Sequence, residues 1–148
     1  MSRQAGATKF EFALTVAIFG VLAALLLQRL TLIEEDAERI EVDLTIRNMR
    51  VGIQLAIGER IMRGDEERLA EVAAASPVDM LGKRPRGFVA EPAATAAGEW
   101  AYDPRRRELR YLPRLPQAFG GADELRWRYV ARTDAAGKVV GVSLVGLN

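Results

Sequence analysis

The residue that most needs a chemical partner in this sequence is Glu11. Its carboxylate stands directly before Phe12–Leu27, an apolar run that holds no other charged side chain. An acidic residue at the centre of a membrane-spanning helix costs about 2.5–3.5 kcal/mol on insertion scales, so Glu11 requires a positive partner. A cut after Gly6 would supply one, because it would leave a free ammonium group on Ala7.

The composition offers little for catalysis. The chain has no cysteine and no histidine, which excludes thiol chemistry, cysteine-based zinc sites and the commonest general base. The remaining carboxylates, hydroxyls and lysines do not cluster in the sequence. Neither Asp103 nor Asp134 belongs to a loop dense in the oxygen ligands that calcium requires. The sequence therefore predicts no catalytic residues, no metal site and no cofactor, and it indicates that the protein is not an enzyme.

The element that positions Glu11 is a hydrophobic anchor. The run Phe12–Gln28 is at the short end of the roughly 17–25 residues that a membrane-spanning helix needs. Arg3 and Lys9 precede it, and basic residues mark the cytoplasmic side of a span. We expect a cytoplasmic N-terminus, one transmembrane helix and a C-terminal body on the other side of the membrane. A secretory signal differs from this arrangement, because its cleavage site follows the apolar core.

The segment Gly6-Ala7-Thr8-Lys9-Phe10-Glu11 resembles the prepilin cleavage and methylation motif of type IV pilins and type II secretion pseudopilins. The following run, Ala17–Ala24, is similar to the anchors of that family. The resemblance covers about the first thirty residues. It implies cleavage between Gly6 and Ala7 by a prepilin peptidase and N-methyltransferase, and assembly with other subunits. It also implies insertion in the bacterial inner membrane, with a periplasmic C-terminal domain, and contact with an inner-membrane assembly platform. Ala7, Lys9 and Gln28 depart from the family pattern, which favours a minor subunit.

Three partners are open to the Glu11 carboxylate. The resemblance implies that it pairs with the Ala7 ammonium of a neighbouring subunit and so sets the register of assembly. Two unit charges about 4 Å apart attract by about 4 kcal/mol at an effective dielectric of 20. Alternatively, Glu11 pairs with the Ala7 ammonium of its own helix, four residues earlier. In the third alternative it rests among lipid headgroups, where the helix dipole favours a carboxylate.

A helical pattern continues beyond the anchor. Apolar residues recur at steps of three and four from Leu30 to Val51, interrupted by Arg47, and no proline occurs before Pro77. This predicts one helix from Ala7 to about Met62, whose second half packs on the C-terminal body. Gly52 and Gly58 are expected to weaken it, each by about 1 kcal/mol relative to alanine. A short second helix is expected over about Asp65–Ala75.

Alternating residues predict two β-hairpins near the C-terminus. In the first, Trp100 and Tyr102 share a face with Leu109 and Tyr111; the second joins about Leu125–Thr133 to Lys138–Val145. The predicted fold is α+β, a long N-terminal helix packed on a four-stranded antiparallel sheet, as in pilins. The expected divisions are a leader at 1–6, the anchor at 7–28, its periplasmic continuation at 29–63, a short helix and loop at 64–98, and the sheet at 99–148.

Charge divides the chain and raises a second hypothesis. Residues 28–82 carry seven basic and twelve acidic side chains, whereas residues 83–148 carry twelve basic and seven acidic ones. Arginines of the predicted sheet could contact nucleic-acid phosphates or a protein partner. These candidates are Arg105, Arg106, Arg107, Arg110, Arg126 and Arg128, together with Arg114 and Arg132. A solvated sheet face, or contact with acidic neighbours, explains the same pattern.

The sequence thus predicts a structural subunit, a minor pilin or pseudopilin, held in a filament by packing of anchor helices. Two alternatives are a DNA-contacting minor pilin of an uptake system and an unprocessed single-pass membrane protein with a periplasmic partner-binding domain. The expected partners are other pilin or pseudopilin subunits, the peptidase, the assembly platform and the lipid bilayer, with nucleic acid as the alternative. The motif does not distinguish a type IV pilus from a secretion pseudopilus.

Overall fold

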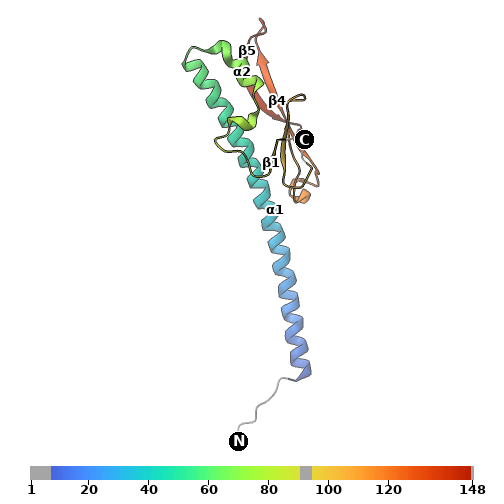
Figure 1. Cartoon of the computed structure of the whole chain (residues 1–148). Helices are drawn as coiled ribbons and strands as arrows, with labels where there is room; N and C mark the ends of the chain where they lie inside the picture. The colour runs from blue at the N-terminus through green and yellow to red at the C-terminus, as the bar shows by residue number, and fades with distance from the viewer. Residues whose placement is uncertain (1–7, 91–94, 148) are drawn as a thin grey trace. The chain divides into compact units, whose positions relative to one another are not determined.

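One long helix dominates the chain. The computed structural model describes residues 8–90 and 95–147, in which α1 runs from Lys9 to Met62 (Figure 1). The expected start of the helix, Ala7, lies outside the described residues. Gly64 stops the helix after Met62, because its φ of 73° is open to glycine at little cost, and Asp65 N donates to Arg60 O at 2.9 Å.

The chain divides into two compact units between Ala37 and Glu38, inside α1. We call the described residues before this division the anchor unit and those after it the head unit. The anchor unit is long and apolar enough to cross a membrane, and the most apolar stretch of α1 has none of its side chains buried. Its two threonines beyond Phe12 satisfy their hydroxyls locally: Thr15 donates to Glu11 O at 2.8 Å and Thr31 to Leu27 O at 3.1 Å.

The head unit contains a five-stranded sheet in the order β1-β2-β3-β4-β5. The strands are β1 (Phe88–Val89), β2 (Trp100–Asp103), β3 (Glu108–Tyr111), β4 (Leu125–Thr133) and β5 (Val139–Gly146). Neighbouring strands are antiparallel except β1 and β2, which are parallel. The α+β class is confirmed, but the prediction of four strands is wrong.

The unpredicted strand, β1, lies in the segment that the sequence analysis assigned to a loop. Two residues are too few to show an alternating pattern. The strand forms because tertiary contacts bring it beside β2. Gly87 has a φ of 74°, and a side chain there would place its Cβ 2.3 Å from Gly98 O. Its own carbonyl accepts from Trp100 N at 2.9 Å. This close approach of two backbones, possible only for glycine, brings β1 beside β2.

Short helical segments connect α1 to the sheet and β3 to β4. The segment expected as one helix over Asp65–Ala75 is a 3₁₀ turn, η1 (Glu66–Arg68), followed by α2 (Leu69–Ala74). The next 3₁₀ turn, η2 (Pro77–Met80), is capped by Ser76, whose Oγ accepts from Val78 N at 3.2 Å. A third, η3 (Pro116–Phe119), lies between β3 and β4.

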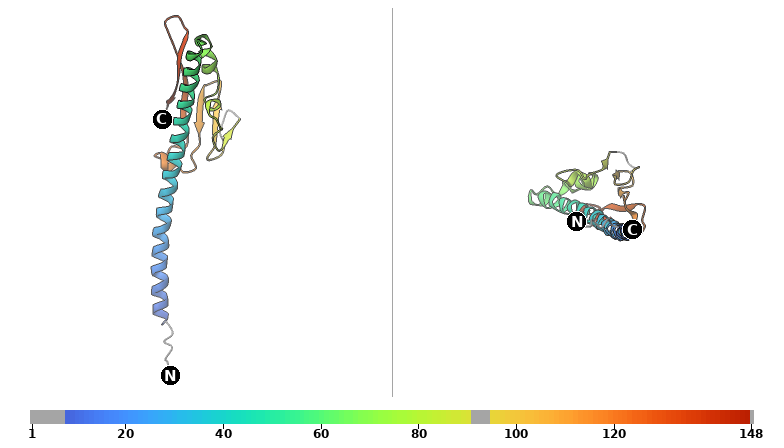
Figure 2. Two further views of the ribbon diagram at one scale, coloured as in Figure 1. Left: turned by 90° about the vertical axis from the view of Figure 1, so that its left-hand side faces the viewer. Right: turned by 90° about the horizontal axis from the view of Figure 1, so that it is seen from below.

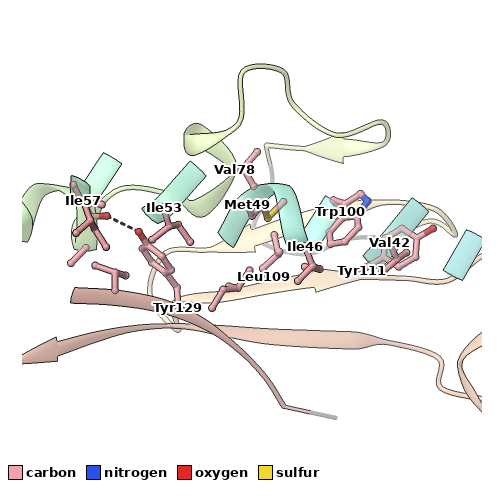
Figure 3. Close-up of a cluster of buried hydrophobic side chains, with 14 of the residues drawn as sticks. Val42, Ile46, Met49, Ile53, Ile57, Val78, Trp100, Leu109, Tyr111 and Tyr129 are labelled. Atoms are coloured by element: carbon pink, nitrogen blue, oxygen red, sulfur yellow. Dashed lines mark hydrogen bonds between the residues drawn. The ribbon is translucent and has the colours of Figure 1, made fainter. Parts of the chain in front are cut away.

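The core of the head unit lies between α1 and the sheet, which form its two layers (Figure 2). On the helix, it consists of the inner face, Val42, Ile46, Met49, Ile53 and Ile57. On the sheet, Trp100 is paired with Tyr111 and Tyr102 with Leu109, which confirms the predicted shared face. Figure 3 shows Trp100, Leu109 and Tyr111 among the buried side chains of this core. The Trp100 ring lies 4.6 Å from that of Tyr111 and 5.6 Å from that of Trp127. These aromatic pairs fix how β2, β3 and β4 meet the helix.

Candidate assembly site

Glu11 takes part in a reciprocal cap at the start of α1. Its Oε2 accepts from Thr8 N at 2.8 Å, while Glu11 N donates to Thr8 Oγ1 at 3.3 Å. A Thr-x-x-Glu pair bonded in this way satisfies two of the amide groups that a helix start leaves without intrahelical partners. Gly6 and Ala7, the predicted processing site, lie outside the described residues.

The cap is a role for Glu11 that the sequence analysis missed. The signal was present, because Thr8 stands three residues before Glu11 and directly before the apolar run. The bond to Thr8 N uses a residue that remains on the chain after a cut at Gly6. The Glu11 carboxylate therefore already accepts a hydrogen bond within its own chain. An ammonium group of another chain would have to compete with Thr8 N for this carboxylate.

The outer face of α1 in the head unit carries a second apolar surface. Its members are Ile40, Leu44, Val51, Leu55 and Met62, which are 57%, 51%, 57%, 68% and 84% exposed. Three residues of the periodicity noticed in the sequence, Ile40, Leu44 and Val51, belong to this face. The buried inner face is a different set of residues on the opposite side of the helix. Arg47 interrupts the outer face and pairs with Asp43 at 2.8 Å.

The two helical glycines of the head unit have opposite surroundings. A Cβ on Gly52 would lie 2.3 Å from Met80 O, so glycine is what allows η2 to approach the helix. A Cβ on Gly58 would meet nothing within 4 Å. Gly58 lies on the outer face between Leu55 and Met62. Gly58 therefore weakens the helix, and no close packing among the described residues offsets this loss of helix stability.

Three of the candidate arginines lie in a network of ion pairs on β3 and β4. Arg128 Nη2 donates to Glu108 Oε1 at 2.7 Å, and Arg110 Nη1 donates to Glu124 Oε1 at 3.5 Å. Arg126 Nε lies 3.8 Å from Glu124 Oε2. The hydrogen bond from Arg128 holds the pKa of Glu108 below its ordinary value, although burial opposes this shift. The pairing of β3 with β4 brings these arginines together, but Glu108 and Glu124 already neutralise part of their charge.

Three further candidates, Arg105, Arg106 and Arg107, form the exposed turn between β2 and β3. Asp103 Oδ1 organises this turn by accepting from Arg105 N at 2.8 Å and Arg106 N at 3.2 Å. These bonds, the one from Arg106 first, lower the pKa of Asp103. Arg107 has a φ of 55°, and its carbonyl accepts from Tyr129 N at 2.8 Å. The backbone of the turn is thus fixed while the three side chains remain exposed.

The structure also contains a buried carboxylate that the sequence analysis did not single out. Glu38 is 3% exposed and accepts three hydrogen bonds. They come from the Tyr111 hydroxyl at 2.7 Å, Arg114 N at 2.7 Å and Leu115 N at 2.9 Å. Burial, and secondarily Glu38, raise the pKa of Tyr111 above its ordinary value. The helical spacing of Glu38 and Val42 placed this carboxylate on the buried face, but only the strand pairing supplies its donors.

Two further contacts hold the segment between β3 and β4 to the part of α1 that follows Glu38. Arg114 Nη2 donates to Glu41 Oε2 at 2.8 Å, and Arg39 Nε donates to Ala118 O at 2.8 Å. The loop around Arg114 is therefore held to the helix. Arg132, the remaining arginine of the sheet, lies on β4 with its guanidinium across Gly141.

None of the described segments brings together three or more Asp and Glu side chains as a potential metal site. No family model, curated protein or solved structure matches the chain. The functional interpretation therefore rests on the chain's own residues, and above all on the cap at Glu11 and the outer face of α1.

Proposed function

We propose that this chain is a structural subunit of a bacterial envelope filament, a minor pilin or pseudopilin. In this proposal a peptidase removes residues 1–6, the anchor helix holds the subunit in the inner membrane, and the head unit lies in the periplasm. Assembly joins α1 to the α1 helices of other subunits. The similarity of residues 6–11 and 17–24 to prepilin anchors supports this proposal at the sequence level.

The observation that carries the proposal is the outer face of α1. An isolated membrane-anchored domain needs one apolar face, which here packs on the sheet. The head unit has a second one on the same helix, with five large side chains at least half exposed. A surface of this kind on a soluble domain marks an interaction site. A helical partner fits it, because the apolar residues follow the spacing of a helix-packing stripe.

The DNA-contacting alternative has less support from the described residues. Three of its candidate arginines, Arg110, Arg126 and Arg128, are ion-paired to Glu108 and Glu124. The β2–β3 turn keeps three exposed arginines, and phosphate binding by them would be strongly dependent on salt. We do not propose a nucleic-acid function on this turn alone.

Processing is tested by the intact mass of the protein extracted from membranes of cells that contain a prepilin peptidase. The proposal expects loss of Met1–Gly6, with or without one added methyl group. An uncut chain in the presence of an active peptidase would contradict it and favour the unprocessed single-pass protein.

The role of Glu11 is tested with two substitutions that separate its charge from its cap. Glu11→Gln retains an amide oxygen able to accept from Thr8 N, since Gln also serves in this cap, but removes the charge. Thr8→Val retains the charge and removes the hydroxyl that caps Glu11 N. Glu11→Gln should abolish co-assembly while leaving membrane insertion normal. Thr8→Val should reduce assembly less. Equal assembly of wild type and Glu11→Gln would refute the charge-pairing role.

A further inference from the structure

The edge of the sheet that β5 forms is open. Among the described residues, no strand pairs with the side of β5 that faces away from β4. Ladder bonds in an antiparallel pair fall on every second residue, and Leu147 N donates to Arg126 O at 2.9 Å. Counted back from Leu147, the backbone groups of Leu144 and Val142 therefore point away from the sheet. Such an edge is a template for an extended segment of another chain.

Arg50 on α1 reaches this open edge from the helix side. Its Nε donates to Leu144 O at 3.2 Å, as expected for a carbonyl that faces away from β4. The Arg50 side chain is exposed and has no carboxylate partner within residues 8–90 and 95–147. A hollow of about 140 Å³ lies beside it. This hollow is lined by Arg50, Ile53 and Gln54 of α1 and by residues 142–144 of β5.

A second arginine reaches β5 from the other face of the sheet. Arg132 on β4 is paired with Gly141 on β5, and its Nη2 lies 3.0 Å from the place where a Cβ on Gly141 would stand. The absence of a side chain on Gly141 thus lets the guanidinium lie over β5. Arg132 is exposed, and its guanidinium has no ion pair in the part of the chain that the structure describes.

We propose that the open edge of β5 binds an extended, acidic segment of a different protein as an added strand, with one carboxylate at Arg50 and another at Arg132. Opposed residues of neighbouring strands share a face, and successive residues of a strand alternate between faces. Leu144 and Gly141 are three residues apart, so the positions opposite them lie on opposite faces of the sheet. The expected segment therefore carries two acidic residues three positions apart. This inference does not depend on filament assembly.

Charge favours this occupant over a second copy of the chain. The two edge strands of the sheet, β1 and β5, contain no acidic residue, so neither would supply the carboxylates. An acidic strand supplies both kinds of group. Its N–H takes over Leu144 O, and its carboxylate receives the released Arg50 guanidinium in a hydrogen bond between ions, which is stronger than one to a neutral carbonyl. Until a partner binds, Arg50 covers the edge against unwanted pairing.

A synthetic peptide tests the charge pattern on the full-length protein in detergent micelles. The fluorescently labelled probe alternates valine and threonine, with glutamate at its fourth and seventh positions. Fluorescence anisotropy should show binding at least about tenfold tighter than that of the same peptide with lysine at both positions. Equal affinity of the two peptides, or no binding of either, would overturn the proposal.

Charge reversal in the protein tests each contact separately. Arg50→Glu and Arg132→Glu should each weaken binding of the glutamate peptide about tenfold. A lysine at only one of the two peptide positions should restore the affinity, at a different position for each variant. Arg105→Glu, the same reversal on the β2–β3 turn, is the matched control and should change the affinity less than about twofold. Restoration at neither position, or an equal loss with Arg105→Glu, would refute the assigned contacts.

Methylation of the peptide backbone distinguishes strand pairing from charge attraction alone. Only every second N–H of an added strand faces β5, so N-methyl groups on one alternating set of residues should lower the affinity about tenfold. The same groups on the other set should have little effect. Insensitivity to both sets would overturn the added strand. Displacement of the peptide by duplex DNA whose own binding is lost in Arg50→Glu and Arg132→Glu would assign the arginines to phosphates instead.

Discussion

The inner and outer faces of α1 in the head unit are both apolar, yet they are put to different use. The inner face is buried against the sheet and includes a charged residue, Glu38, whose carboxylate is fully supplied with donors. The outer face also carries apolar residues at helical spacing, interrupted by Arg47 and Gly58, and it is exposed. Regular hydrophobic periodicity thus identifies a packing surface without saying which partner covers it. In this helix two stripes have helical spacing, and only one of them is covered by the sheet.

The largest contrast between the faces is expected at the buried carboxylate. Glu38→Leu leaves the Tyr111 hydroxyl, Arg114 N and Leu115 N without their acceptor and should destabilise the head unit by about 3–5 kcal/mol. Glu41→Gln, also beside Arg114 but exposed, should cost less than about 1 kcal/mol. Thermal unfolding followed by tryptophan fluorescence measures both. Equal losses of stability in the two variants would show that the buried carboxylate of Glu38 matters no more than the exposed one of Glu41.

The next largest difference in stability between the two faces is expected when an apolar side chain is truncated to alanine. Ile53→Ala opens a cavity in the core and should cost about 2–5 kcal/mol, because Ile53 is 1% exposed. Leu55→Ala, two residues later on the outer face, should change the stability of the unassembled chain by less than about 0.5 kcal/mol. Denaturant unfolding of the dispersed protein gives both values. A large loss with Leu55→Ala would mean that the outer face is covered within the monomer.

Substitution of Gly52 and Gly58 by alanine should change the stability of the head unit in opposite directions. Gly52→Ala forces a Cβ against the backbone carbonyl of Met80 and should destabilise the head unit by about 1–3 kcal/mol. Gly58→Ala fills open space on an exposed helix and should stabilise it by up to about 1 kcal/mol. Calorimetric melting of the two variants against wild type is the measurement. Destabilisation by Gly58→Ala would contradict the open surroundings of this residue.

A smaller effect is expected from alkaline pH on the sheet side of the core. Burial raises the pKa of Tyr129 to about 12, and its hydroxyl donates to Val72 O at 2.8 Å. Above the ordinary tyrosine pKa of 10.0, the unfolded chain loses this proton first, so stability falls as the pH rises. Between about pH 10 and 11 the loss should be about 1 kcal/mol.

Tyr129→Phe is the matched variant for this pH dependence. It removes the titrating group, so its stability should fall less steeply over the same interval. Identical slopes for Tyr129→Phe and wild type would assign the alkaline loss to other groups.

The sequence predicted the strands of the second hairpin well because their alternation is long and regular. Leu125–Thr133 is the predicted strand, and β5 differs from its prediction by one residue at each end. The end of α1 at Met62 also follows from local signals, the absence of proline and the glycine that ends it. The processing and pairing roles of Gly6, Ala7 and Glu11 stay predictions.

The sequence could not indicate β1 or the donors of Glu38. A two-residue strand has no period, and it depends on the contact of Gly87 with Gly98, eleven residues apart in the chain. The donors of Glu38 lie more than seventy residues away. Neither feature leaves a local pattern, because each is created when distant backbones meet.

By itself, the sequence determined the apolar anchor, the uninterrupted helix and the alternating strands, since each depends on the propensities and spacing of neighbouring residues. Only the tertiary structure decided which face of α1 is buried. That choice depends on which side chains the aromatic sheet can accept, so Met49 and Ile53 are covered by the sheet while Val51 and Leu55 are left exposed. It also decided that Gly52 is needed by the fold and that Gly58 is not, because a Cβ on Gly52 would meet the backbone of Met80 whereas one on Gly58 would meet nothing.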